Sequence, residues 1–269
     1  MKFLQKYKRT FILAFQNEME YRANFLLGIV SGGFVMVVQC FLWTAVFNSS
    51  PNSSVFGYTY SQMITYSIYS GIVAKLVSTG FQGEIANDIK NGGLSKFIAQ
   101  PINYFSYRIC NFFGGKILQT IIVLIILFVT MFISNTLWNM KVGVFSLVLF
   151  MLSVILGMVI NFLIFYSVSS LAFIMTEVWG VFVAFGQGIF LLSGGIFPLD
   201  MFGEKVKSCL DLLPFGYIVY FPVNIINGHL NTSQIMDGML RQGIWIILLV
   251  IISKISWKNG MRKYVAVGG

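Results

Sequence analysis

The sequence contains few charged residues and especially few acidic ones. Only 10% of the 269 residues are charged, and 18 Lys and Arg outnumber 9 Asp and Glu. A soluble domain usually carries roughly 25% charged residues, whereas this chain is 57% hydrophobic with a mean hydropathy of +0.81. Because a chain of this composition has too little polar surface to cover itself in water, it is predicted to be an integral membrane protein.

Residues that usually carry catalysis or bind metals are also scarce. His229 is the only histidine, and no partner stands at metal-ligand spacing from it. The three cysteines are widely spaced, without a CxxC pair. There is no GxSxG motif and no Walker A loop, since Gly115-Lys116 is followed by Ile117. We therefore expect a protein that is not an enzyme, with no catalytic residue, no metal site and no ATP site of its own.

Long apolar runs dominate the rest of the chain. Crossing about 30 Å of hydrocarbon takes about 20 apolar residues in a helix, and such runs favour helices over the ten-residue alternation of a membrane barrel. The sequence predicts an all-α membrane protein forming one transmembrane domain (1–269). Its six predicted membrane helices are Ala23–Phe47, Tyr58–Phe81, Phe105–Ile133, Val142–Ile174, Val178–Phe197 and Ile235–Trp257.

The distribution of Lys and Arg predicts the orientation. With both termini in the cytoplasm, thirteen basic residues flank the spans on that side, and only Lys141, Lys205, Lys207 and Arg241 lie outside. This bias favours a multi-pass protein of the plasma membrane with both termini cytoplasmic. The topology, together with anionic lipid at the inner surface, accounts for the net charge of +9 without a nucleic-acid partner. Lys75 lies inside a predicted span, where it either snorkels to the interface or lines a substrate path.

Residues 1–22 have the pattern of an amphipathic helix. One face of the helical wheel is apolar, and basic and amide side chains lie opposite. We expect this segment to lie in the inner headgroup layer, although an ordinary basic leader before the first span remains an alternative. The apolar face consists of Phe3, Leu4, Tyr7, Phe11, Ala14 and Phe15.

The letters LSGG, at Leu192–Gly195, match the start of the signature motif of ABC ATPases. In an ATPase this motif begins a helix in a cytosolic domain, whereas here it ends an apolar helix on the predicted outer side. It is therefore interpreted as a helix end. The following segment, 198–228, contains Pro198, Pro214 and Pro222, which divide it into short pieces. A broken outer hairpin before the last helix is expected, because broken helices are tolerated where they are buried in protein.

The segment between the second and third predicted spans, 84–101, has features of a short cytoplasmic helix. Ile85 and Ile89 stand one turn apart, and Glu84 and Asp88 form a parallel acidic pair. Gly92-Gly93 can supply the left-handed residue that ends a helix. We expect a helix that presents an apolar and an acidic stripe to the cytosol; a loop that only connects two spans is the alternative.

Two stretches resemble permeases of the type-2 ATP-binding-cassette (ABC) export class, in particular a bacterial branch of six-span permeases. The pattern SG-x-IFPL…PF-x-Y-x-x-YFP…G fits from Ser193 to Gly228, with Gly203 as a departure where relatives often have proline. An acidic residue followed by I-x-x-G-x-L-x-x-x-[IL]-x-x-P fits from Glu84 to Pro101. Together with the basic start and the six predicted spans, the resemblance covers essentially the whole chain.

The resemblance implies two functional regions. The first is a coupling helix that sits in a cleft of a cytoplasmic ATPase, with the residues Glu84, Ile85, Asp88, Ile89, Gly92, Leu94, Ile98 and Pro101. The second is an outer hairpin and gate, with the residues Ser193, Gly194, Phe197, Pro198, Pro214, Phe215, Tyr217, Tyr220, Pro222 and Gly228.

By the same resemblance, the chain is expected to be the permease subunit of an ATP-driven exporter. ATP and Mg²⁺ would be bound by separate ATPase subunits, and a second permease, identical or a sister chain, would complete the pathway. Many aromatic residues and few charges within the spans suit an apolar or amphipathic cargo such as a drug, peptide or lipid, and hence a role in drug or antimicrobial resistance. The alternative is a self-sufficient secondary transporter or channel, which usually needs ion sites near the midplane. Glu177, at the turn between spans four and five, is interpreted as an interface residue rather than a cation site.

Overall fold

The computed structural model describes residues 2–51, 53–100, 102–138 and 142–264, and most of these are helical. The long helices are α1 (Lys2–Glu20), α2 (Arg22–Ser49), α3 (Tyr60–Val77), α6 (Tyr104–Trp138), α7 (Val144–Ser169), α8 (Trp179–Leu192) and α11 (Thr232–Met261). The short ones are α4 (Gln82–Lys90), α5 (Ser95–Ala99), α9 (Glu204–Asp211), α10 (Tyr220–Ile226) and the 3₁₀ turns η1 (Ser170–Phe173), η2 (Leu199–Phe202) and η3 (Phe215–Tyr217). Strands β1 (Ser54–Val55) and β2 (Tyr58–Thr59) form a small antiparallel hairpin.

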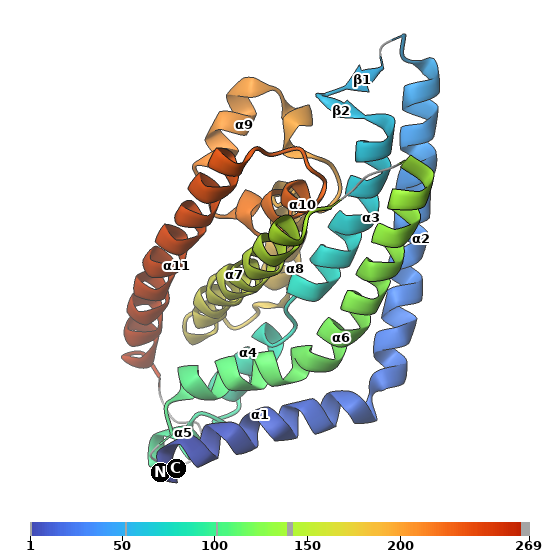
Figure 1. Ribbon diagram of the computed structural model, residues 1–269. Coiled ribbons are helices and arrows are strands. Elements are labelled where there is room, and N and C mark those ends of the chain that lie inside the picture. Colours follow the sequence, from blue (N-terminus) through green and yellow to red (C-terminus); the bar gives the residue numbers. More distant parts are fainter. Residues whose placement is uncertain (1, 52, 101, 139–141, 265–269) are drawn as a thin grey trace.

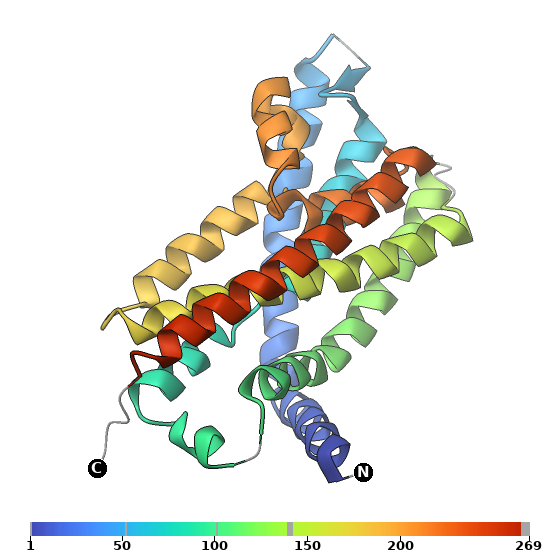
Figure 2. The same cartoon turned by 90° about the vertical axis from the view of Figure 1, so that its left-hand side faces the viewer.

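Several of the short elements gather at two opposite ends of the long helices (Figures 1 and 2). The α4 end consists of α1, α4, α5 and the last turn of α11, and the α9 end consists of the β-hairpin, η2 and α9. Between them, α2 packs on α3 and α11 packs on α7, while α6 follows α1 before turning toward the α9 end.

Within the described residues, four helical segments are long and apolar enough to cross a membrane. They are Leu26–Ser49, Tyr104–Trp138, Val144–Phe173 and Thr232–Met261. The predicted helical membrane fold is therefore confirmed at this level. The other two predicted spans correspond to α3, whose 18 residues span about 27 Å, and α8, whose 14 residues span about 21 Å. The count of six spans stays a prediction.

Helix α1 lies across the molecule and packs along the first part of α6 (Figure 1). Gly114 of α6 makes this possible, because a Cβ at Gly114 would meet the Phe11 carbonyl and the side chain of Ala14. Part of the predicted apolar face of α1 thus contacts protein, whereas Leu13, which is not part of that face, is 64% exposed. The helix at 1–22 is observed, while its place in the headgroup layer stays a prediction.

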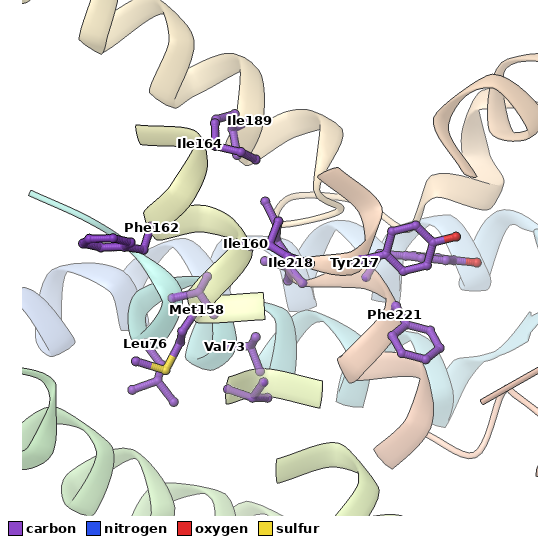
Figure 3. Close-up of a cluster of buried hydrophobic side chains, with 14 of the residues drawn as sticks. Val73, Leu76, Met158, Ile160, Phe162, Ile164, Ile189, Tyr217, Ile218 and Phe221 are labelled. Atoms are coloured by element: carbon purple, nitrogen blue, oxygen red, sulfur yellow. The ribbon is translucent and has the colours of Figure 1, made fainter. Parts of the chain in front are cut away.

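The core is centred on α7, which is the most buried of the four long apolar segments. Figure 3 shows its residues Met158 to Ile164 between side chains of α3 on one side and of η3 and α10 on the other. Gly157 permits the close approach of the second group, since a Cβ there would lie 2.9 Å from the Ile218 carbonyl oxygen. The broken segment before α11 is thereby part of the core rather than a peripheral loop.

Candidate functional site

At the α4 end, the two predicted acidic residues hold the same buried cation. Arg108 of α6 pairs with Glu84 at 2.5 Å and with Asp88 at 2.6 Å. Its Nε donates to the Tyr104 hydroxyl at 2.9 Å, and that hydroxyl donates to Asp88. The Arg108 side chain is only 5% exposed, compared with 15% for Asp88 and 61% for Glu84. The acidic pair therefore fixes α4 to α6, and Glu84 alone also faces solvent.

The apolar stripe of α4 corrects one expectation. Ile85 and Ile89 were predicted to face the cytosol, but they are 0% and 4% exposed and belong to the core. Helix α4 packs with this stripe against α7 and η1. The reason is that a short helix next to the long helices gains more by burying its apolar stripe within its own chain than by leaving it in water.

The end of α4 has the predicted conformation. Gly92 has φ +74°, and Leu94, which is buried, donates its N–H to the Asp88 carbonyl at 3.0 Å. The chain then continues into α5, where Ile98 is 58% exposed. Pro101 lies outside the described residues. Of the predicted coupling residues that the structure describes, Glu84 and Ile98 are thus the ones with substantially exposed side chains.

Further contacts connect this region to the other long helices. The Lys90 ammonium donates to the Thr176 carbonyl, in the turn between α7 and α8. Tyr104 stacks on Trp257 of α11 with the ring centroids 5.0 Å apart, and Trp257 also stacks on Tyr166 of α7. A displacement of α4 would therefore disturb its contacts with α6, with the end of α7 and, through Tyr104 and Trp257, with α11.

At the α9 end, helix α8 stops where the LSGG letters lie. Gly194 has φ +80°, and a Cβ there would lie 2.7 Å from both the Tyr220 Cβ and the Tyr66 hydroxyl oxygen. The Gly194 carbonyl accepts a hydrogen bond from the Tyr66 hydroxyl at 2.7 Å, and the backbone carbonyl of buried Ser193 accepts one from the Tyr220 N–H at 2.8 Å. The interpretation as a helix end is confirmed, and these residues fasten α8 to α3 and α10.

The predicted broken hairpin is present as η2, α9, η3 and α10. Pro198 directly precedes η2, Pro214 directly precedes η3, and Pro222 lies in the first turn of α10, where its missing N–H costs no helix bond. These three prolines are buried. Gly228 ends the segment with φ +68°.

The remaining predicted gate residues take part in packing. Phe197 makes an edge contact with Trp43 of α2 at 6.2 Å, and Phe215 is partly buried against the core. The Tyr217 hydroxyl donates to the Asp211 carbonyl at 3.0 Å.

A partly buried carboxylate organises the α9 end. Asp200 of η2 accepts hydrogen bonds from Tyr58 and Tyr220, each at 2.8 Å, and pairs with Lys207 at 3.0 Å. Burial alone would raise the pKa of Asp200, but the hydrogen bonds from Lys207, Tyr220 and Tyr58 outweigh it and hold this pKa below its ordinary value. Tyr58 also stacks on His229, with the centroids 4.1 Å apart.

The sequence reasoning missed Arg108, Asp200, Tyr58 and Gln242 as organising residues. Arg108 was counted only as a cytoplasmic charge, and Asp200 directly follows the FPL motif without having been singled out. Buried Gln242 of α11 donates to the carbonyls of Ser153 and Tyr217 at 3.0 and 2.9 Å. One signal was available: polar residues inside apolar helices usually pair within the protein.

The lone charges singled out in the sequence lie apart from these clusters. Lys75 is half-buried at the end of α3 and lines a cavity, whereas Glu177 is exposed. Among the described residues, no group of three His, Cys, Asp or Glu side chains could hold a metal ion.

Comparison with known families identifies the family to which the chain belongs. Residues 34–268 match the family described as ABC-2 family transporter protein. The chain belongs to this family. No curated protein gives a significant match. As an ABC-2 family member, the chain is a membrane component of an ABC transporter that works with ABC ATPase subunits.

Proposed function

We propose that this chain is the permease subunit of an ATP-driven exporter for an apolar or amphipathic compound. Two permeases, either two copies of this chain or this chain with a sister permease, would form the pathway. A separate cytoplasmic ATPase would bind ATP and Mg²⁺ and supply the energy. Membership of the ABC-2 family supports the ABC alternative over a self-sufficient secondary transporter or channel.

The observation that carries the coupling proposal is the way α4 is fastened. Arg108, Lys90 and Tyr104 connect it to α6, to the α7–α8 turn and, through Trp257, to α11. A helix attached to several long helices can transmit a push, whereas a loose connector cannot. ATP-driven closure of the ATPase would then bias the permease pair between two packings.

The surface offered to the ATPase would consist of the exposed parts of α4, α5 and their connection. Glu84 supplies a charge there, and Ile98 supplies an apolar anchor. The buried Ile85, Ile89 and Leu94 would act indirectly by keeping α4 in place. This revises the coupling set predicted from the sequence while keeping its location.

The α9 end would act as the outer gate. Its short helices are held by hydrogen bonds to Asp200 and to the end of α8. Asn227, at the end of α10, also accepts a hydrogen bond from Thr65 of α3, so that the short helices would move together with α3 and α8. This assignment places the α4 end and both termini in the cytoplasm. It agrees with the positive-inside distribution and with a six-span plasma-membrane protein.

The experiment is affinity capture of the ATPase by the tagged permease from the native host, followed by substrate-stimulated ATP turnover in proteoliposomes. Ile98→Asp should remove most of the captured ATPase without impairing insertion, because it places a charge in a small apolar contact. Leu212→Asp is the matched control, since Leu212 is 70% exposed at the α9 end. Equal capture by the wild type and both variants would contradict the proposed docking surface.

A further inference from the structure

Two cavities of different character meet at one side chain, Lys116 of α6. The first, called the polar cavity below, has a volume of about 500 Å³ and a mixed wall that includes the polar side chains of Glu18, Lys75, Ser78 and Gln119. The second has a volume of about 430 Å³ and is almost entirely apolar, with a wall formed by α3, α6, α7 and one residue of α1. Lys116 is 8% exposed and lines both.

Both cavities follow α6. Asn111, Gly115 and Gln119 line the polar cavity, while the apolar cavity begins beside it at Phe113 and continues alone to Leu127. From Lys116 to Leu127 the helix rises about 16 Å. The space therefore has the shape of a polar head compartment joined to a tail compartment of acyl-chain length.

Helix α1 covers both compartments from the same face. Phe11 lines the apolar cavity and Glu18 lines the polar one, and residues seven apart lie on one side of a helix. Because α1 packs along α6 at the α4 end, the polar compartment lies at that end of the molecule (Figure 1).

The charges in the polar compartment favour an anionic headgroup. Four charged side chains line it, but the carboxylate of Glu84 is paired with Arg108. This leaves two lysines, Lys75 and Lys116, facing the single carboxylate of Glu18. Among the described residues neither lysine forms an ion pair: Lys116 donates to Gln119 at 2.9 Å, and Gln119 contacts Glu18 at 3.4 Å. A buried ammonium without an ionic partner is costly unless an anion joins it.

We propose that the two cavities form one binding site for an amphiphile with an anionic headgroup and a single apolar chain. The headgroup lies between Lys75 and Lys116, and the chain lies along Val123 and Leu127 toward α7. The idea that the bound amphiphile is the transported cargo rests on the proposed function. The binding site itself does not, because a resident membrane lipid would fit it as well. A phosphate or carboxylate headgroup meets both lysines equally well.

The test measures binding of radiolabelled dodecyl phosphate to the full chain in nanodiscs of phosphatidylcholine. Dodecanol should compete weakly because it lacks the charge, and inorganic phosphate should compete weakly because it lacks the chain. Lys75→Gln and Lys116→Gln should each weaken binding on the order of tenfold, while Lys116→Arg should largely restore it. Lys205→Gln, which changes an exposed lysine of α9, is the control.

The apolar compartment is tested separately. Val123 is 3% exposed and lines the cavity, so that Val123→Phe should fill the space and weaken binding of dodecyl phosphate. Ile125→Phe changes the same helix on a face that is 59% exposed and should have no effect. Equal competition by dodecanol and dodecyl phosphate, or unchanged binding in both lysine variants, would overturn the site.

Two further measurements distinguish the source of the amphiphile. A lipid that copurifies with the wild-type chain but not with Lys116→Gln identifies a resident membrane lipid. Stimulation of ATP turnover by dodecyl phosphate in the permease–ATPase complex identifies a cargo. Since the binding assay contains no ATPase, failure of the exporter proposal would leave its result intact.

Discussion

The α4 end and the α9 end are built with opposite charges. At the α4 end one buried cation, Arg108, holds two carboxylates. At the α9 end one carboxylate, Asp200, holds one cation and two tyrosine hydroxyls. In both places a charge from one element holds side chains of other elements, including a short helix.

The difference lies in how much solvent reaches each cluster. At the α4 end, Glu84 is 61% exposed, so that part of the cluster is accessible to a partner protein. At the α9 end, Asp200 is mostly enclosed by tyrosines, and the Lys207 side chain is 34% exposed. The α4 end is thus suited to contact a partner protein that displaces it. The α9 end is suited to keep its conformation until the long helices move.

The largest effect is expected from removing the buried cation. Arg108→Gln leaves Asp88 without its ionic partner in a site that is mostly buried, which should cost about 3–5 kcal/mol of unfolding free energy. Arg241→Gln is the matched control, since its pair with Asp237 is exposed and spans one helical turn; about 0.5 kcal/mol is expected there. Equilibrium unfolding in mixed micelles checks both. Similar losses in the two variants would mean that burial does not set the strength of the α4 cluster.

A smaller effect is expected where α8 ends. Gly194→Ala combines a left-handed backbone, costing about 1–2 kcal/mol, with overpacking against Tyr66 and Tyr220, costing roughly 1–3 kcal/mol. Gly228→Ala has a similar positive φ but no atom within 4 Å of the added Cβ, so that only the backbone cost remains. Unfolding measurements on both variants isolate the packing contribution. If the two substitutions lowered the unfolding free energy equally, α8 would not be tightly packed against α10.

The pH dependence of the α9 end should follow Asp200. Its folded-state pKa is below the unfolded value, so its stabilisation is fully present above about pH 4 and is lost as the pH falls through the folded pKa. Asp200→Asn should therefore lower the Tm at neutral pH, by an amount corresponding to about 1–3 kcal/mol. The difference in Tm from the wild type should shrink below about pH 4. A difference that stayed constant with pH would show that the charge of Asp200 contributes nothing.

Much of the fold could be predicted from patterns that act locally. Apolar runs located the long helices, Pro198 and Pro214 marked the breaks, and Gly92 and Gly194 marked helix ends, because each of these acts on its own few residues. The clusters could not be predicted in the same way. Arg108 meets Glu84 across 24 positions, and Tyr58 meets Asp200 across 142, and a single sequence carries no signal for such pairings.

The direction in which α4 faces also depends on long-range packing. The spacing of Ile85 and Ile89 predicts an apolar stripe, but it does not say whether the stripe meets its own chain or a partner. The position of α7 decides this, and both residues are buried against the chain. The same reasoning moves the expected partner contact from the stripe to Glu84 and Ile98.

The smallest effect on stability is expected at Glu84, and it separates the two carboxylates that share Arg108. Glu84→Gln removes a largely exposed half of the cluster, which should change the unfolding free energy by less than about 1 kcal/mol. Asp88→Asn removes the half that is 15% exposed and also weakens the bond from Tyr104, so its cost should be larger. ATPase capture should rank the two in the reverse order, because only Glu84 presents its charge to a partner. Measuring unfolding and capture on both variants therefore tests the division of roles within the α4 cluster. If Asp88→Asn lost more ATPase than Glu84→Gln at equal permease folding, the exposed carboxylate would not be the contact, and the docking surface would have to lie elsewhere on the α4 end.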